Sequence, residues 1–260
     1  MIAMLRLHSV ISSGFGKETG LISFLYSYLL NKYGLDFYDL IIVNHVGIEL
    51  EEKVFYDKGR VHINIRHPID AAFLSKSMDE KNVIFLDIVH AALLRLASED
   101  DRIASSRLNE IKEEILSKNF LFDIEYMVVP SDTDDSLVAK ILLRPHADRF
   151  DFFARIDYKN QVKWEALIYE GGPSSYYFDD LFYNGEWKGK TEFVVAGKRS
   201  EIVFHFNADD GRITLINTSE NKSKAPVFSL FRVNAGSQEL QDYINSLPPA
   251  VAGMITYQPN

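Results

Sequence analysis

The stretch MLRLHSVISSGFGKETGLISFLYSYLLNKYG (residues 4–34) decides how the first part of the chain folds. It opens with a short apolar run that is typical of a β-strand. Leu21, Leu25 and Tyr28 then recur at the spacing of one helical face. Gly34 follows directly and suits the left-handed residue that ends many helices. The stretch therefore predicts a strand, a glycine-rich loop and a helix.

Mixed helical and strand periods continue to about residue 121. YDLIIVNHV (38–46) predicts a buried strand, and RVHINIRHP (60–68) predicts an alternating strand that Pro68 ends. The apolar stripes of residues 83–97 and of SSRLNEIKEEILSKN (105–119) predict two further helices.

From Phe122 onward the apolar period switches to two. Turns are predicted at Lys159–Asn160–Gln161, at Asn184–Gly185 and at Asp209–Asp210–Gly211. We expect one curled antiparallel meander of about seven strands. SQELQDYINSL (237–247) predicts a short C-terminal helix.

The predicted fold class is thus α+β, with a mixed α/β portion over residues 1–121 and the antiparallel β portion over 122–260. No linker rich in Pro, Gly or Ser separates the two portions. We therefore expect one continuous unit with a shared core rather than two independent domains.

The composition excludes several classes of function. The chain has 260 residues and no cysteine, which removes disulfides, thiolate nucleophiles and cysteine-held metals. No apolar run reaches the roughly 20 residues of a membrane span, and no leader pattern is visible, so we expect a cytoplasmic protein. The net charge is −9, with −3 over residues 1–122 and −6 over the rest. This balance disfavours nucleic acid and suits a basic protein partner.

The loop SSGFGKETG (12–20) suggests a phosphate-binding turn. The Walker pattern fails, because Ile11 stands where a glycine is needed and Glu18 stands where a hydroxyl is needed. Gly14, Gly16 and Gly20 miss the dinucleotide spacing by one residue, although Lys17 supplies a charge. The alternative interpretation, which we favour, is a plain strand-to-helix turn.

The second candidate site is the aromatic segment GGPSSYYFDDLFYNGEW (171–187). Exposed Tyr and Trp side chains are typical interface anchors, and acids among them suit a basic partner. The expected partner-binding residues are Tyr176, Tyr177, Asp179, Asp180, Tyr183 and Trp187. A sheet that packs on both faces explains the same pattern equally well.

No reaction centre stands out in the rest of the chain. His90 lacks the second histidine and the glutamate of a zinc-protease helix, and we expect a half-buried, hydrogen-bonded ring. A three-histidine metal site from His45, His62 and His67 is the weakest hypothesis, and we expect no metal or cofactor. No Gly-x-Ser-x-Gly elbow exists to support a serine triad.

Two functions follow from these features. The favoured one is a non-catalytic acidic binding protein, inhibitor-like or immunity-like, that covers a basic protein partner. The alternative is a nucleotide-binding enzyme or sensor that uses the loop from Gly14 to Gly20. The sequence leaves open whether the protein catalyses a reaction and which oligomeric state it adopts.

Overall fold

The computed structural model describes residues 4–9, 18–69, 72–171, 181–198, 202–217 and 255–259. The chain forms two compact units, which we call the N-terminal unit (Met1–Phe122 with Pro145–Arg149) and the C-terminal unit (Asp123–Arg144 with Phe150–Asn260). Helices and separate sheets make the class α+β, as predicted. The helix predicted over 237–247 lies outside the described residues.

The N-terminal unit is built on a four-stranded sheet. Its strands are β1 (Met4–Ser9), β2 (Leu40–His45), β3 (Lys53–Asp57) and β4 (Arg60–Ile65), in the order β1-β2-β4-β3. β1, β2 and β4 are parallel, and β3 pairs antiparallel with β4. The sequence did not predict β3, because this edge strand has an almost wholly exposed face and lacks an apolar alternation.

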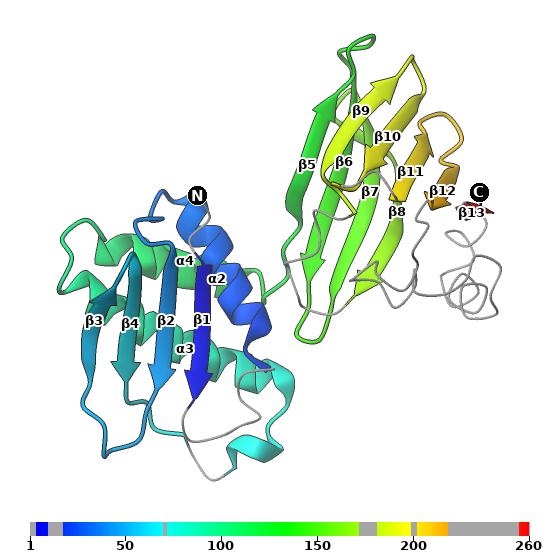
Figure 1. Cartoon of the computed structure of the whole chain (residues 1–260). Coiled ribbons are helices and arrows are strands. Elements are labelled where there is room, and N and C mark those ends of the chain that lie inside the picture. The colour runs from blue at the N-terminus through cyan, green and yellow to red at the C-terminus, as the bar shows by residue number, and fades with distance from the viewer. Residues whose placement is uncertain are drawn as a thin grey trace. The chain divides into compact units, whose positions relative to one another are not determined.

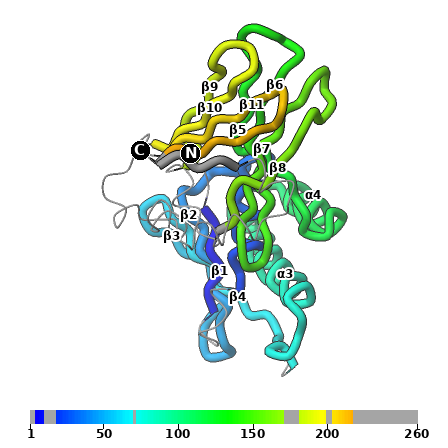
Figure 2. The backbone as a smooth tube through the Cα atoms, turned by 90° about the vertical axis from the view of Figure 1, so that its right-hand side faces the viewer, coloured from blue at the N-terminus to red at the C-terminus, as the bar shows by residue number. Residues whose placement is uncertain are grey.

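Three helices cover one face of this sheet: α2 (Gly20–Lys32), α3 (Met78–Ala97) and α4 (Ser105–Ser117). Figure 2 shows α3 and α4 on the same side of the strands. The strand residues that point toward the helices are buried: Leu5, Leu7, Ile41, Val43, Val61, Ile63 and Ile65. None of the helices in the described ranges is both long and apolar enough to cross a membrane.

Helix α3 begins at Met78 rather than at Val83, where the apolar stripe alone placed its start. The reason is a capping box that the sequence analysis missed. The Ser77 side chain accepts from the Glu80 backbone N–H, and the Glu80 carboxylate accepts from the Ser77 backbone N–H. Lys81 and Asn82, which enter the candidate site below, are therefore the fourth and fifth residues of α3.

The outer edge of β1 is closed by side chains of α2 and its N-cap. The Leu5 backbone N–H donates to Ser27 Oγ at 2.8 Å, and Thr19 Oγ1 donates to the Leu7 carbonyl at 3.3 Å. These bonds satisfy an edge that could otherwise pair with another chain. They also hold the start of α2 beside the end of β1.

The C-terminal unit contains two sheets rather than the single meander expected from the sequence. Its strands are β5 (Ile124–Pro130), β6 (Leu137–Pro145), β7 (Phe150–Tyr158), β8 (Gln161–Gly171), β9 (Asn184–Lys188), β10 (Glu192–Ala196), β11 (Ile202–Asn207), β12 (Ile213–Asn217) and β13 (Ile255–Pro259). β5 to β8 form one sheet in chain order, and the second has the order β13-β12-β11-β10-β9. The meander prediction is wrong, because an apolar sheet face needs cover and the second sheet provides it (Figure 1).

The two sheets share an aromatic core. The Phe152 and Phe182 rings lie 4.7 Å apart, and both side chains are fully buried. The turn predicted at Asn184–Gly185 is also wrong, since both residues lie inside β9. A side chain at Gly185 would meet Met127 Sδ at 2.5 Å, so glycine here permits close packing rather than a turn.

The other two predicted turns are confirmed. Lys159 and Asn160 both have positive φ and join β7 to β8. Gly211 has a φ of 71° and lies between β11 and β12. These residues tolerate the left-handed backbone that tight hairpins require.

Candidate functional site at the carboxyl edge of the N-terminal sheet

The carboxyl ends of the parallel strands β1, β2 and β4 meet at one edge of the N-terminal sheet. Helix α2 follows β1 along the chain and α3 follows β4, so both helices begin at this same edge. In open α/β sheets, ligands bind outside the carboxyl ends of the strands. We call Ser9, Glu18, His45, Lys81 and Asn82 the carboxyl-edge site.

Ser9 and His45 end β1 and β2 and lie opposite each other in the parallel register. Ser9 Oγ lies 3.3 Å from His45 Nδ1, and His45 Nε2 lies 2.8 Å from the His67 carbonyl oxygen. His45 is 1% exposed, whereas Ser9 is half-buried. The serine hydroxyl is thus the more accessible end of a hydrogen-bonded chain.

The hydrogen-bond partners determine the proton position on the neutral His45 ring. A carbonyl oxygen only accepts, so the ring donates from Nε2 to His67. Nδ1 then carries the lone pair and accepts from the Ser9 hydroxyl. Burial lowers the pKa of the neighbouring His67 ring, so this ring carries no charge near neutral pH.

Lys81, the fourth residue of α3, pairs with Glu18, which directly precedes the N-cap of α2. Lys81 Nζ donates to Glu18 Oε1 at 3.0 Å and lies over the Phe73 ring, 5.5 Å from its centroid. The Lys81 side chain is 9% exposed and that of Glu18 is 34% exposed. A lysine ammonium has three N–H donors, and in the described part of the chain Lys81 uses one of them.

Asn82, the next residue of α3, is 2% exposed. Its side-chain Oδ1 is fully buried and has no hydrogen-bond partner among the described residues. Buried polar atoms are nearly always bonded, and one that is not needs an explanation such as a missing ligand or water. Lys81 and Asn82 together bring unused donors and an unused acceptor to one helical turn.

The polar groups deeper in the helical layer are satisfied by one another. The Tyr26 hydroxyl lies 3.0 Å from His90 Nδ1, and His90 Nε2 lies 3.1 Å from Asn109 Oδ1. Burial raises the pKa of Tyr26 and lowers that of His90, so both groups are neutral near neutral pH. The expected hydrogen-bonded ring at position 90 is confirmed, but His90 is buried rather than half-buried.

The glycine-rich loop runs from β1 to α2. Gly14, Gly16 and Lys17 lie outside the described residues, and Gly20 is the first residue of α2. The described residues on each side of the loop, Ser9 and Glu18, both belong to the carboxyl-edge site. The Glu18 carboxylate, which stands where the Walker pattern needs a hydroxyl, pairs with Lys81.

The three histidines of the weakest metal hypothesis do not converge. His62 lies on the opposite sheet face from His45, stacked on the Phe55 ring at 4.7 Å between centroids. Both ring nitrogens of His45 have hydrogen-bond partners. In the part of the chain that the structure describes, no group of three acidic or histidine side chains could hold a metal ion.

The aromatic segment is described only in part. Tyr176, Tyr177, Asp179 and Asp180 lie outside the described residues. Tyr183 is 57% exposed, with Lys198 Nζ 5.8 Å from the centre of its ring. Trp187 is buried in β9 and donates from Nε1 to the Val129 carbonyl at 3.0 Å, so its side chain is part of the core between the sheets.

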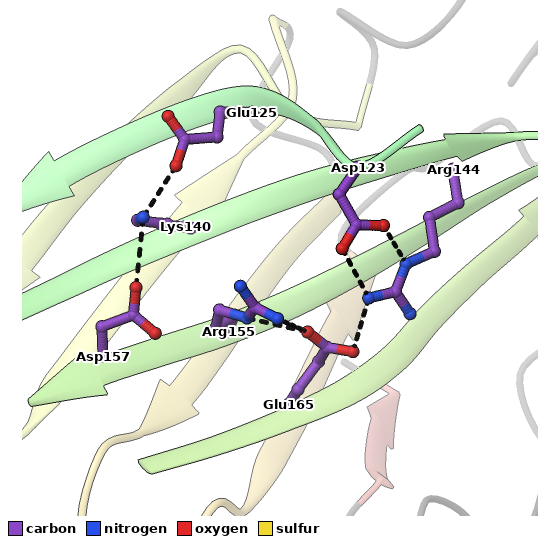
Figure 3. A network of polar contacts seen from close by, with 7 residues as sticks. All are labelled: Asp123, Glu125, Lys140, Arg144, Arg155, Asp157 and Glu165. Atoms are coloured by element: carbon purple, nitrogen blue, oxygen red, sulfur yellow. Dashed lines mark hydrogen bonds and ion pairs between the residues drawn. The ribbon is translucent and has the colours of Figure 1, made fainter. Parts of the chain in front are cut away.

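A second dense polar cluster lies on the sheet β5–β8. Glu165 accepts from both Arg144 and Arg155, and Arg144 also binds Asp123 (Figure 3). Lys140 lies between Glu125 and Asp157 in the same way. We call these seven residues the sandwich network: Asp123, Glu125, Lys140, Arg144, Arg155, Asp157 and Glu165. Its four acids and three bases largely neutralise one another.

Sequence reasoning did not identify Ser9, Lys81 or Asn82 as site residues. Ser9 carried one usable signal, since it directly precedes the glycine-rich loop at the end of a predicted strand. Lys81 and Asn82 carried a weaker signal, the Ser77–Glu80 capping pattern that extends α3 to them. Comparisons with protein-family models, with curated proteins and with solved structures found no significant match.

Proposed function

We propose that the carboxyl-edge site binds a phosphorylated small molecule, and that this ligand is a nucleotide. The observation that carries the proposal is the pair of adjacent buried residues with unused hydrogen-bonding groups, Lys81 and Asn82. They are the fourth and fifth residues of a helix that begins at the carboxyl edge of the parallel strands β1, β2 and β4. This is where α/β folds bind phosphate-bearing ligands.

The chemistry of the two side chains favours a nucleotide over inorganic phosphate. The Lys81 ammonium suits a phosphate oxygen, because a cation strengthens a hydrogen bond to an anion. The Asn82 Oδ1 atom needs a donor, which phosphate at neutral pH scarcely provides but a ribose hydroxyl or a base amino group does.

Ligand-dependent thermal stability tests the proposal. Wild-type protein is unfolded in the presence of ATP, GTP, NAD or NADP. At a hundred times its dissociation constant, a bound nucleotide stabilises the protein by about 2.7 kcal/mol. Lys81→Gln should abolish this shift. Lys112→Gln is the matched control, because Lys112 pairs with Asp87 elsewhere in the helical layer. The absence of a shift with every nucleotide contradicts the proposal.

The other function expected from the sequence, an acidic protein covering a basic partner, draws less support. The acids of the sandwich network are already paired with Arg and Lys. Trp187 is buried, and the exposed Tyr183 ring has a lysine over its face instead of an acid. Binding of a basic protein to the wild-type chain, with loss of that binding in the Tyr183→Ala variant, would support this alternative.

A further inference from the structure

The hydroxyl of Ser9 is bonded to a buried histidine whose far nitrogen is fixed by a backbone carbonyl. This arrangement provides a nucleophile, a base and a group that orients the base. We infer that Ser9 is a nucleophile activated by His45 and that the carboxyl-edge site hydrolyses a carboxylic ester. The further idea that this ester also carries a phosphate rests on the proposed function. The serine chemistry itself rests only on the hydrogen-bonded pair of Ser9 and His45, which we call the dyad.

The distance and the tautomer both suit proton transfer. A separation of 3.3 Å between Ser9 Oγ and His45 Nδ1 is typical of an active site without substrate, where such bonds are often long. The His67 carbonyl holds the ring with its lone pair toward Ser9. It also stabilises the imidazolium that forms when Nδ1 takes a proton, as the third group of a triad does.

The proposed step balances with water as the only co-reactant. Ser9 Oγ forms a bond to the ester carbonyl carbon while its proton moves to His45 Nδ1. The carbon–oxygen bond to the alcohol breaks, and that proton moves to the departing oxygen. Water then attacks the acyl-serine through the same base, releasing the carboxylic acid and restoring the Ser9 hydroxyl.

The position of Ser9 fits this chemistry without a nucleophile elbow. Ser9 is the last residue of β1, so its backbone is fixed by pairing to β2 while its side chain reaches the edge. Thr19, the N-cap of α2, donates from Oγ1 to the carbonyl of Leu7, which lies two residues before Ser9 on β1.

Covalent labelling of wild-type protein with a fluorophosphonate probe tests the inference. Such probes react with activated serines, and peptide mapping then identifies the modified residue. We expect the adduct on Ser9, its loss in Ser9→Ala and labelling at least about 100-fold slower in His45→Gln. The glutamine keeps a donor for the His67 carbonyl and lacks the base. Ser105→Ala, at the start of α4, is the control.

Each outcome decides something. No adduct, an adduct on Ser12 or Ser13, or an unchanged rate in folded His45→Gln overturns the inference. If the Ser9→Ala variant fails to fold, two measurements still test the inference. They are the position of the adduct on wild-type protein and the labelling rate of His45→Gln. Labelling of Ser9 that ATP does not slow, together with no thermal shift, leaves the dyad intact and overturns the proposed nucleotide. A nucleotide-dependent thermal shift without labelling of Ser9 overturns the serine nucleophile and leaves the proposed nucleotide intact.

Discussion

The carboxyl-edge site and the sandwich network both contain buried or half-buried charged side chains, and they differ in how many charged partners these side chains have. In the sandwich network, Glu165 binds two arginines and Arg144 binds two carboxylates. In the carboxyl-edge site, Lys81 makes one ion pair and Asn82 Oδ1 makes no bond within the described residues. Paired charges stabilise a sheet, whereas an unused buried group favours a ligand or a water. Among the described residues, the sandwich network has one such atom, Asp157 Oδ1, on a carboxylate whose other oxygen pairs with Lys140.

The largest effect that separates the two regions is expected from Glu165→Gln. This change keeps the side-chain volume and removes the negative charge that Arg144 and Arg155 share. We expect a loss of about 2 kcal/mol in the free energy of unfolding, because two partly buried guanidinium groups lose their common carboxylate. Urea unfolding of the full chain measures it.

The matched control for that change is Glu186→Gln, also in the C-terminal unit. Glu186 forms an exposed pair with Lys188, so its loss should cost less than about 0.5 kcal/mol. Equal losses for both variants would show that the sandwich network adds nothing beyond an exposed ion pair. Neither variant should alter a nucleotide-dependent shift.

A smaller effect, of opposite sign, is expected from Asn82→Leu at the carboxyl edge. Leucine removes a buried acceptor without a partner and favours the helix, so the free energy of unfolding should rise by about 1 kcal/mol. The same variant should lose the nucleotide-dependent shift. A variant that is more stable than wild type but no longer binds the nucleotide indicates that Asn82 serves binding rather than stability.

Asn109→Leu is the control for Asn82→Leu. Asn109 Oδ1 accepts from His90 Nε2, so this asparagine is already satisfied. Its replacement should lower the free energy of unfolding by about 1 kcal/mol. If both asparagine variants lower the free energy of unfolding equally, Asn82 Oδ1 does have a hydrogen-bond partner in the protein, contrary to the role proposed for it.

The smallest effect concerns the pH dependence of the sandwich network. The Arg144 guanidinium holds the pKa of Asp123 below its usual value, against the opposing effect of burial. A lowered pKa in the folded state stabilises above the unfolded value of about 4 and is lost as the pH falls through the folded value. Asp123→Asn should therefore cost about 0.5–1 kcal/mol at pH 7, and this cost should shrink as the pH falls through the folded pKa of Asp123. A difference that is independent of pH in acid unfolding curves would contradict this.

The sequence was informative where one face of an element decides its structure. The stripes of α2 and α4 and the alternation of β4 predicted those elements, and the turn at Lys159–Asn160 followed from residues that tolerate positive φ. The division into two sheets was not predictable, because strands that alternate in polarity have the same pattern in one sheet as in two. The turn predicted at Asn184–Gly185 was wrong for a related reason. A glycine is equally typical of a tight turn and of a close contact inside a sheet, and Gly185 makes such a contact with Met127.

The candidate site was only half visible in the sequence. The glycine-rich loop pointed to the carboxyl edge, but the residues that line it come from three separate segments. Periodicity reports which face of a helix is buried and takes no account of a buried lysine such as Lys81. The pairing of Ser9 with His45 depends on the parallel register of β1 and β2, which no local pattern specifies.

The most direct test of the central claim, that the carboxyl edge binds a nucleotide, is a titration of ¹⁵N-labelled protein with ATP followed by amide NMR shifts. The account predicts that the amides of Ser9, Glu18, Gly20, Lys81 and Asn82 shift together with one dissociation constant. It also predicts that the amides of Arg144, Arg155 and Glu165 in the sandwich network stay in place. No shift at saturating ATP, or shifts confined to the C-terminal unit, would contradict it.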